Sequence, residues 1–276
     1  MTLSERNFFF KTGIFFSAAV ILLILAASFL TIPMYPEIEE NTRRPAYFFQ
    51  TVSGSILGNN YYAVHSLLAL AAIFSFTVML LIHIFFERTP APEILYIAFF
   101  VISLSFEALR LLLPLHLVLN FPSIYLRIAT RVLLFARFVG IFSLLTASLC
   151  ASGMDVQKNR NAIFIIIIAA LAVTIGVPID SQTWDTGFNL ITGYLTMFRV
   201  VEILVFLITI ASFLIASKIR DTKEYIFVAV GVMLALMGRN ILLYSDNWIT
   251  VGMGIVMLAL GTWFLCTRIH KINLWM

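Results

Sequence analysis

Charged residues are scarce in this chain. Of its 276 residues only 12% are Asp, Glu, Lys or Arg, whereas 61% are hydrophobic, and the mean hydropathy is +1.01. A water-soluble protein of this length needs far more polar surface, so the composition predicts a polytopic membrane protein. The net charge of +4 is spread over short loops and helix interiors without a basic stripe, so nucleic-acid binding is not indicated.

Cysteines are few and catalytic motifs are absent. Cys150 and Cys266 are the two cysteines, too few for a disulfide framework, and we interpret them as small packing residues. The sequence has no HExxH, GxSxG or paired-aspartate motif, and no lysine in a helix core to carry a retinal Schiff base. Protease, hydrolase and metal-dependent phosphotransferase chemistry is therefore not indicated. We predict no catalytic residue, metal or cofactor, and a non-enzymatic role is favoured.

Apolar runs, in contrast, are abundant. Backbone amides in lipid must be satisfied within their own segment, so each run is expected to be a transmembrane helix of one all-α bundle covering residues 1–276. The eight expected helices are residues 12–33, 63–86, 94–119, 125–149, 162–178, 188–216, 225–244 and 247–267. The first run resembles a signal sequence, but at about 21 residues it exceeds the roughly 7–15 of an ordinary signal segment. An uncleaved first helix is favoured over a cleaved one.

Lysine and arginine are distributed unevenly over the predicted loops. With the N-terminus inside, ten of them are cytoplasmic: Arg6, Lys11, Arg88, Lys158, Arg160, Lys218, Arg220, Lys223, Arg268 and Lys271. Only Arg43 and Arg44, in the predicted outer loop 34–62, fall outside. Because positive loops stay in the cytoplasm, both termini are predicted to be cytoplasmic. The membrane is expected to be a bacterial inner membrane.

Ionisable side chains also lie inside the predicted helices. They are the arginines Arg110, Arg127, Arg131, Arg137, Arg199 and Arg239, and the acids Glu107 and Glu202. Such groups are costly in a bilayer and usually face a bundle interior or a watery cavity. Glu107 and Arg110 are three residues apart on one helix face and are expected to pair. Arg199 and Glu202 are also three residues apart on one helix and are likewise expected to pair with each other.

In the predicted orientation most of these residues lie in the outer half of the bundle, and there we predict a pocket. Arginine outnumbers glutamate in it. A guanidinium stays charged and suits carboxylate or phosphate, so the excess predicts an anionic small molecule or a lipid headgroup as ligand. The predicted ligand contacts are Arg110, Arg131, Arg137 and Arg199, oriented by Glu107 and Glu202; as an alternative, the pairs only fix helix packing. Four residues are predicted to be peripheral: Arg127 and Arg239, which can snorkel to headgroups, and His65 and His116, which form no metal set.

Residues 61–145 carry a pattern of their own. It opens with YYAVHSLLAL at residues 61–70, continues through Glu107, and ends with ATRVLLFARF at residues 129–138. This pattern resembles the membrane-associated multi-helix sensor domains found ahead of bacterial histidine kinases and diguanylate cyclases. The resemblance implies a receptor for a small ligand or a membrane state, whose signal passes to an output domain. Only RIHKINLWM follows the last predicted helix, so a stand-alone module that needs a partner is implied.

Three functions therefore stay open, of which the third, an enzyme that acts on lipids with Glu107 or a histidine as base, is the least favoured because no nucleophile or metal set is present. The first is a stand-alone receptor-like or regulatory module that binds an anionic or amphiphilic ligand and signals to a cytoplasmic or membrane partner. The second is a transporter or lipid-handling protein that uses the same pocket. The second requires a path through the cytoplasmic half of the bundle, which is nearly uncharged.

The predicted orientation can be checked with a reporter fused after Met276. Because the positive-inside bias puts that end in the cytoplasm, we expect a green fluorescent fusion to fluoresce and an alkaline phosphatase fusion to be inactive. A phosphatase signal from that position would reverse the orientation and every depth inferred from it.

Overall fold

The protein is an all-α helical bundle. The computed structural model describes residues 3–34, 60–87, 91–153 and 159–274, and it is 86% helical. Seven of the described helices are long and apolar enough to cross a membrane, in agreement with the predicted helical membrane protein. The predicted outer loop 34–62 falls almost wholly outside the described residues.

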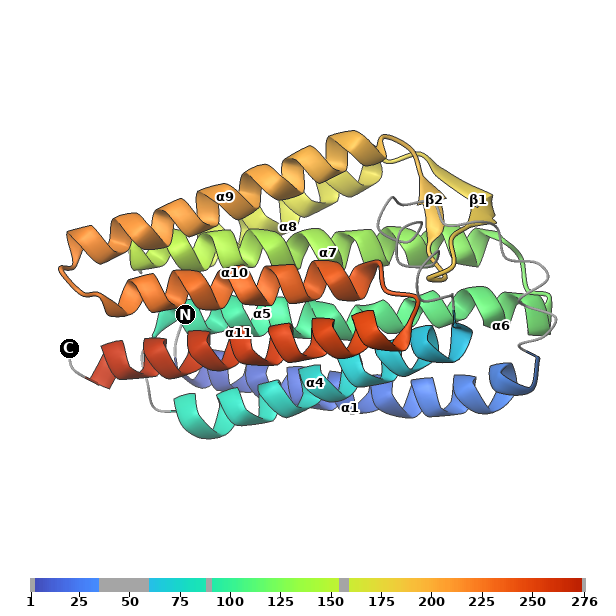
Figure 1. Cartoon of the computed structure of the whole chain (residues 1–276), viewed down its shortest axis with the longest axis horizontal. Helices are drawn as coiled ribbons and strands as arrows, with labels where there is room; N and C mark the ends of the chain where they lie inside the picture. Colours follow the sequence, from blue (N-terminus) through green and yellow to red (C-terminus); the bar gives the residue numbers. More distant parts are fainter. Residues whose placement is uncertain (1–2, 35–59, 88–90, 154–158, 275–276) are drawn as a thin grey trace.

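The helices lie side by side along the long axis of the molecule (Figure 1). In chain order they are α1 (Leu3–Thr31), η1 (Ile32–Met34), α4 (Tyr61–Phe86), α5 (Pro92–Ser105), η2 (Phe106–Leu111), α6 (Leu112–Leu119), α7 (Ile124–Ala151), α8 (Asn159–Ile175), α9 (Leu195–Ile219), α10 (Glu224–Leu243) and α11 (Trp248–Leu274). The strands β1 (Ile179–Trp184) and β2 (Leu190–Thr192) form a hairpin between α8 and α9. Helix α1 begins and α11 ends at one end of the bundle, and the hairpin lies at the other (Figure 1). We call the latter the hairpin end.

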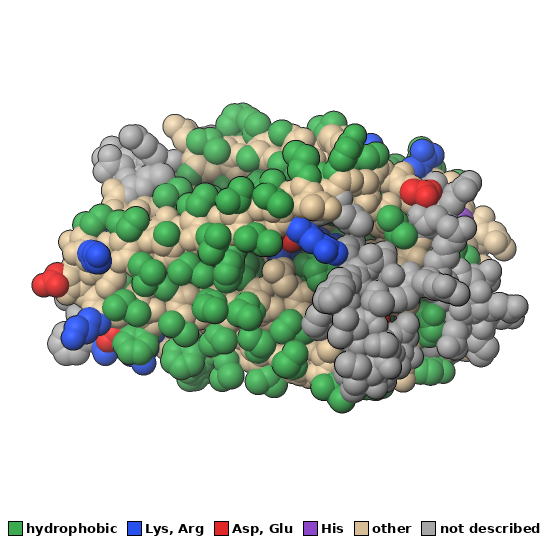
Figure 2. All heavy atoms as spheres, turned by 45° about the horizontal axis from the view of Figure 1, so that its top comes forward, with side chains coloured by type: hydrophobic (Ala, Val, Ile, Leu, Met, Phe, Trp, Pro, Cys, Tyr) green, Lys and Arg blue, Asp and Glu red, His purple; other side chains and the backbone are tan. Residues whose placement is uncertain are grey.

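The sides of the bundle are hydrophobic. Large apolar side chains are exposed along the helices, including Phe15, Phe29 and Trp263. In the view of Figure 2 they cover most of the middle of the molecule, while charged side chains gather mainly near the two ends. Such a surface suits lipid tails in the middle and water or headgroups at the ends.

The third predicted helix, residues 94–119, is interrupted. Helix α5 stops at Ser105, and the 3-10 segment η2 precedes the short helix α6. Pro114 gives the reason: it has no N–H for the carbonyl of Arg110, and its ring crowds that carbonyl. In the tighter 3-10 turn the side chains of residues i and i+3 eclipse one another, so Glu107 and Arg110 come onto one side of the segment.

The sixth predicted helix begins later than expected. Residues 188–194 are not helical; residues 190–192 form β2, which pairs antiparallel with β1. The Asp185 carboxylate accepts hydrogen bonds from the backbone N–H groups of Gly187 at 2.9 Å and Asn189 at 2.7 Å. A side chain that satisfies the backbone in this way competes with helix formation, and this turn is why the helix prediction from residue 188 is wrong.

Glycines let α10 and α11 approach one another closely. A Cβ at Gly261 would lie 2.7 Å from the carbonyl oxygen of Gly231 and would also meet the backbone nitrogen of Ala235. A Cβ at Gly254 would lie 2.8 Å from Leu242 Cγ. Gly231 and Gly238 on α10 are seven residues apart, as are Gly254 and Gly261 on α11. The small-residue faces that this spacing makes lie against each other, as is usual for close helix pairs in membranes.

A methyl group at Gly261 should disrupt this contact. We expect Gly261→Ala to destabilise the protein by about 1–3 kcal/mol because the two backbones must separate. Gly252→Ala is a matched control on the same helix, since a Cβ there has nothing within 4 Å, and it should be neutral or slightly stabilising. Thermal unfolding in mild detergent measures both, and equal melting temperatures for the two variants would contradict the packing described.

Candidate functional site

A buried carboxylate lies at the centre of a polar cluster at the hairpin end. Glu107, on η2, is only 3% exposed. Arg137, on α7, donates to both of its oxygens, from Nε to Oε1 at 2.7 Å and from Nη2 to Oε2 at 2.6 Å. Arg110 Nη1 lies 3.6 Å from Oε2, so the predicted pair of Glu107 with Arg110 is confirmed. The closer, bidentate partner is Arg137, and pairs of that geometry are the strong ones.

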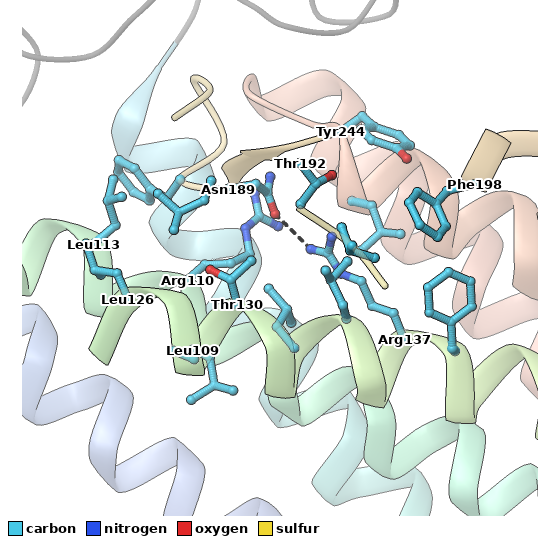
Figure 3. A pocket seen from close by; sticks show the side chains of 18 of the residues that line it. Leu109, Arg110, Leu113, Leu126, Thr130, Arg137, Asn189, Thr192, Phe198 and Tyr244 are labelled. Atoms are coloured by element: carbon cyan, nitrogen blue, oxygen red, sulfur yellow. Dashed lines mark hydrogen bonds between the residues drawn. The ribbon is translucent and has the colours of Figure 1, made fainter. Parts of the chain in front are cut away.

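The two arginines also connect the bundle to the hairpin. Arg110 Nε donates to the Gly187 carbonyl at 2.7 Å, and its Nη2 donates to the same oxygen. The close approach needs a glycine, because a Cβ at Gly187 would lie 2.7 Å from Arg110 Nη2. Arg137 Nη2 donates to Asn189 Oδ1 at 2.8 Å, the dashed line in Figure 3. The side chains that hold Glu107 therefore hold the hairpin as well.

Two acids that the sequence places in outer loops are folded into this end of the bundle. Asp185 and Asp246 are both completely buried. Asp185 accepts from the Asn189 side-chain amide at 3.0 Å, besides the backbone bonds of its turn. Asp246 accepts from the Thr186 hydroxyl at 3.1 Å. Buried carboxylates need such partners, and these anchor the hairpin to the turn between α10 and α11.

Arg239 is the least exposed of the arginines predicted to lie inside the membrane helices. It is 1% exposed, and its Nη2 donates to the Arg137 carbonyl at 3.3 Å. Its Nη1 has no hydrogen-bond partner among the described residues. The carboxylates of Glu202 and Glu107 act on it electrostatically. The expectation that Arg239 snorkels towards headgroups is wrong, because the α10 face that carries it packs inside the bundle.

Among the described residues of this interior, the predicted excess of buried arginine is not found. Four arginines lie in this interior or line its cavity: Arg110, Arg137, Arg199 and Arg239. Four acids lie with them: Glu107, Glu202, Asp185 and Asp246. Charge is balanced because the hairpin and the α10–α11 turn bring in two carboxylates that the helices alone do not supply.

A small cavity lies among these groups. Its volume is about 60 Å³, and α7, η2, the hairpin, α9 and the end of α10 all contribute to its wall (Figure 3). The polar lining residues are Arg110, Thr130, Arg137, Asn189, Thr192, Arg199, Glu202 and Tyr244. The Arg199 guanidinium carbon lies 6.0 Å from the centre of the Tyr244 ring, within cation–π range.

Most, but not all, of the predicted ligand contacts meet at this cavity. Arg110, Arg137, Arg199 and Glu202 line it, and Glu107 lies behind the wall in contact with Arg137. Arg131 does not join them: it is exposed on α7 and is not among the lining residues. The α-helical period explains the difference, because residues six positions apart lie on different faces.

The other three residues predicted to be peripheral each have different surroundings. Arg127 is exposed near the start of α7. His65 is buried and shares a short hydrogen bond with the Ser28 hydroxyl, so it joins α4 to α1. His116 is half-buried, with its ring edge-on to Phe121 at 5.0 Å. Both histidines have packing roles outside the cavity.

Sequence reasoning missed the hairpin residues. Asn189 lines the cavity, and Gly187 and Asp185 hold its loop in place. The run Asp185-Thr186-Gly187-Phe188-Asn189 is rich in turn-forming residues, and that composition is the signal that a turn, and not a helix start, stands there. Phe188 takes a left-handed conformation with φ of 61°, which an apolar helical run does not predict.

Comparison with known proteins places this chain in no family. No protein family, no curated protein and no solved structure compared with it matches. The similarity of residues 61–145 to bacterial sensor domains stays a prediction.

Glu107 can be tested against a surface glutamate. Glu107→Gln leaves buried guanidiniums without their counter-charge, and removal of one partner of a buried pair costs about 3–5 kcal/mol. Glu224→Gln is the matched control, because Glu224 pairs with Arg268 at 2.9 Å in a partly exposed position and such pairs contribute at most about 1 kcal/mol. Denaturant unfolding in mixed micelles measures both losses. A Glu107→Gln variant as stable as Glu224→Gln would show that Glu107 is not the charge on which the cluster depends.

Proposed function

We propose that this protein is a stand-alone, receptor-like membrane module that binds an anionic ligand in the cavity at the hairpin end. The composition of the cavity wall carries the proposal. Three guanidiniums, those of Arg110, Arg137 and Arg199, line the wall against one carboxylate, that of Glu202. The counter-charges Glu107 and Asp185 do not line it. A guest in the cavity therefore meets a positive surface, although the cluster as a whole is balanced.

The size of the cavity narrows the chemistry of the group that it binds. A volume of about 60 Å³ is far below the roughly 300–1,000 Å³ of pockets for drug-sized ligands. It suits a single carboxylate or phosphate group, which planar guanidiniums bind through paired hydrogen bonds. The hydroxyl groups of Thr130, Thr192 and Tyr244 supply further polar contacts.

The contacts of Arg137 provide a route by which ligand binding in the cavity can change the position of the hairpin and of α9. Its guanidinium is held by Glu107 and by Asn189, so a bound anion competes with both for the same donors. Weakening the contact with Asn189 frees one of the links that hold the hairpin. Strand β2 leads through a short turn into α9, so a change at the hairpin moves the start of that helix. Such coupling requires an element with two arrangements that the ligand binds unequally.

We place the hairpin end on the outer side of a bacterial inner membrane, with eight spans and both termini in the cytoplasm. The positive-inside count supports this orientation. Helix α8, with 17 residues, is about 25 Å long and crosses if the bilayer thins or its flanks snorkel. The basic turn between α9 and α10, with Lys218, Arg220 and Lys223, then faces a cytoplasmic or membrane signalling partner.

Arg199 is the side chain with which to test the anion site. It lines the cavity but is exposed, so Arg199→Gln should remove a ligand contact without collapsing the core. With sn-glycerol 3-phosphate as the probe, we expect Arg199→Gln to lower the apparent affinity at least about tenfold, since a charged hydrogen bond contributes roughly 1.5–3 kcal/mol. Thermal unfolding in mild detergent at increasing probe concentration gives this affinity.

The matched control is Arg131→Gln. Arg131 is also an exposed arginine in a membrane helix, but it does not line the cavity, so its variant should bind the probe like the unmodified protein. Equal losses in both variants would mean that the probe responds to overall charge. No stabilisation of the unmodified protein by the probe would count against the site itself.

A further inference from the structure

A second, larger depression lies next to the polar cavity. It is a groove of about 370 Å³ between α9 and α10, and its apolar lining residues are Ile203, Phe206, Leu207 and Met237. Ile203, Leu207 and Met237 are each 40% or more exposed, so the groove is open sideways, towards the surrounding lipid. Its other lining residues are Arg199, Glu202, Asn240 and Tyr244, so its charged groups are those of Arg199 and Glu202.

The groove and the cavity meet at three shared residues. Arg199, Glu202 and Tyr244 line both of them. On the face drawn in Figure 2, basic and acidic side chains lie together in a recess between hydrophobic ones. One continuous surface therefore runs from an arginine-lined cavity, past Arg199 and Glu202 at the junction, along a mainly apolar channel on the outside of the bundle.

We propose that the ligand is an anionic phospholipid of the surrounding bilayer, which enters sideways between α9 and α10. Its phosphate binds at Arg199 and the cavity wall, and one acyl chain lies in the groove along Ile203, Phe206 and Met237. This proposal rests on the proposed anion site and adds the class of ligand and its route. The continuity of the two surfaces, the three guanidiniums against one carboxylate in the cavity wall, and the opening of the groove towards the surrounding lipid favour this occupant.

The two parts of the site then have different tasks. An acyl chain that moves from lipid into the groove leaves one apolar surrounding for another, so little hydrophobic free energy is gained. Affinity comes from the phosphate, which finds guanidinium donors at the edge of a medium of low polarity. The groove directs the chain along α9 and α10. From Arg199 to Leu207 the groove follows α9 for about 12 Å at 1.5 Å per residue, which is enough to hold the upper part of a chain.

Native mass spectrometry can test this with two matched methionine variants. Met237 and Met233 lie one turn apart on α10, both exposed, but only Met237 lines the groove. The protein in mild detergent is given equal amounts of phosphatidylglycerol and phosphatidylcholine with the same chains. We expect at least fivefold preference for phosphatidylglycerol, at least fivefold less of it on Met237→Trp, and unchanged binding on Met233→Trp. Arg199→Gln should bring the preference close to one.

Each of the other outcomes contradicts a different part of the proposal. If sn-glycerol 3-phosphate displaces the lipid, and the Met237→Trp variant binds the lipid like the unmodified protein, the anion site stands. The proposal that the acyl chain lies in the groove is then wrong. If sn-glycerol 3-phosphate binds but neither lipid is retained, the ligand is soluble and the lipid proposal fails alone. If neither anion binds, or Arg199→Gln retains the preference, the anion site fails together with the lipid proposal.

Discussion

The bidentate contact between Glu107 and Arg137 is the interaction on which the polar interior depends. It joins η2 to α7, and through the other contacts of Arg137 and Arg110 it reaches the hairpin. Neither charge is tolerable alone in an apolar bundle, since an unpaired buried ion is far more costly than a paired one. Because an ion pair of this kind can often be replaced by apolar residues without loss of stability, packing alone does not require it. A role in binding gives a reason for its presence.

Two local irregularities make that contact possible. Pro114 interrupts the third spanning helix and leaves Glu107 and Arg110 on a 3-10 turn, where the two side chains are stacked on one side. The Asp185 turn stops the sixth helix from beginning early and leaves a carbonyl and an amide of the hairpin directed at the two arginines. Irregular backbone in a membrane protein is tolerated where it is buried in protein or lines a cavity, and both segments meet that condition.

The polar cavity and the apolar groove fit the boundary at which they lie. A charged group bound deep in hydrocarbon would need complete enclosure, whereas Arg199 stands where the interior opens to the side. The proposed phospholipid would match such a junction at both ends, with its phosphate on the guanidiniums and its chain among apolar side chains. One wall of the groove belongs to α10, which packs closely against α11, and the other belongs to α9, which follows the hairpin.

Composition and periodicity were enough to determine the class of this protein. Long apolar runs can satisfy their backbone in lipid only as helices, so the membrane bundle, the approximate helix positions, the facing glycines of α10 and α11, and the Glu107–Arg110 pair all follow from residues close in sequence. What lies far apart in sequence was decided by the tertiary structure. Nothing in the chain order brings Asp185 and Asp246 inside, turns Arg131 outward and Arg239 inward, or joins Arg137 to Glu107 across 30 residues. The rotation of each helix and the fold of the hairpin set these contacts, because a buried charge is far less costly when the packing gives it a partner.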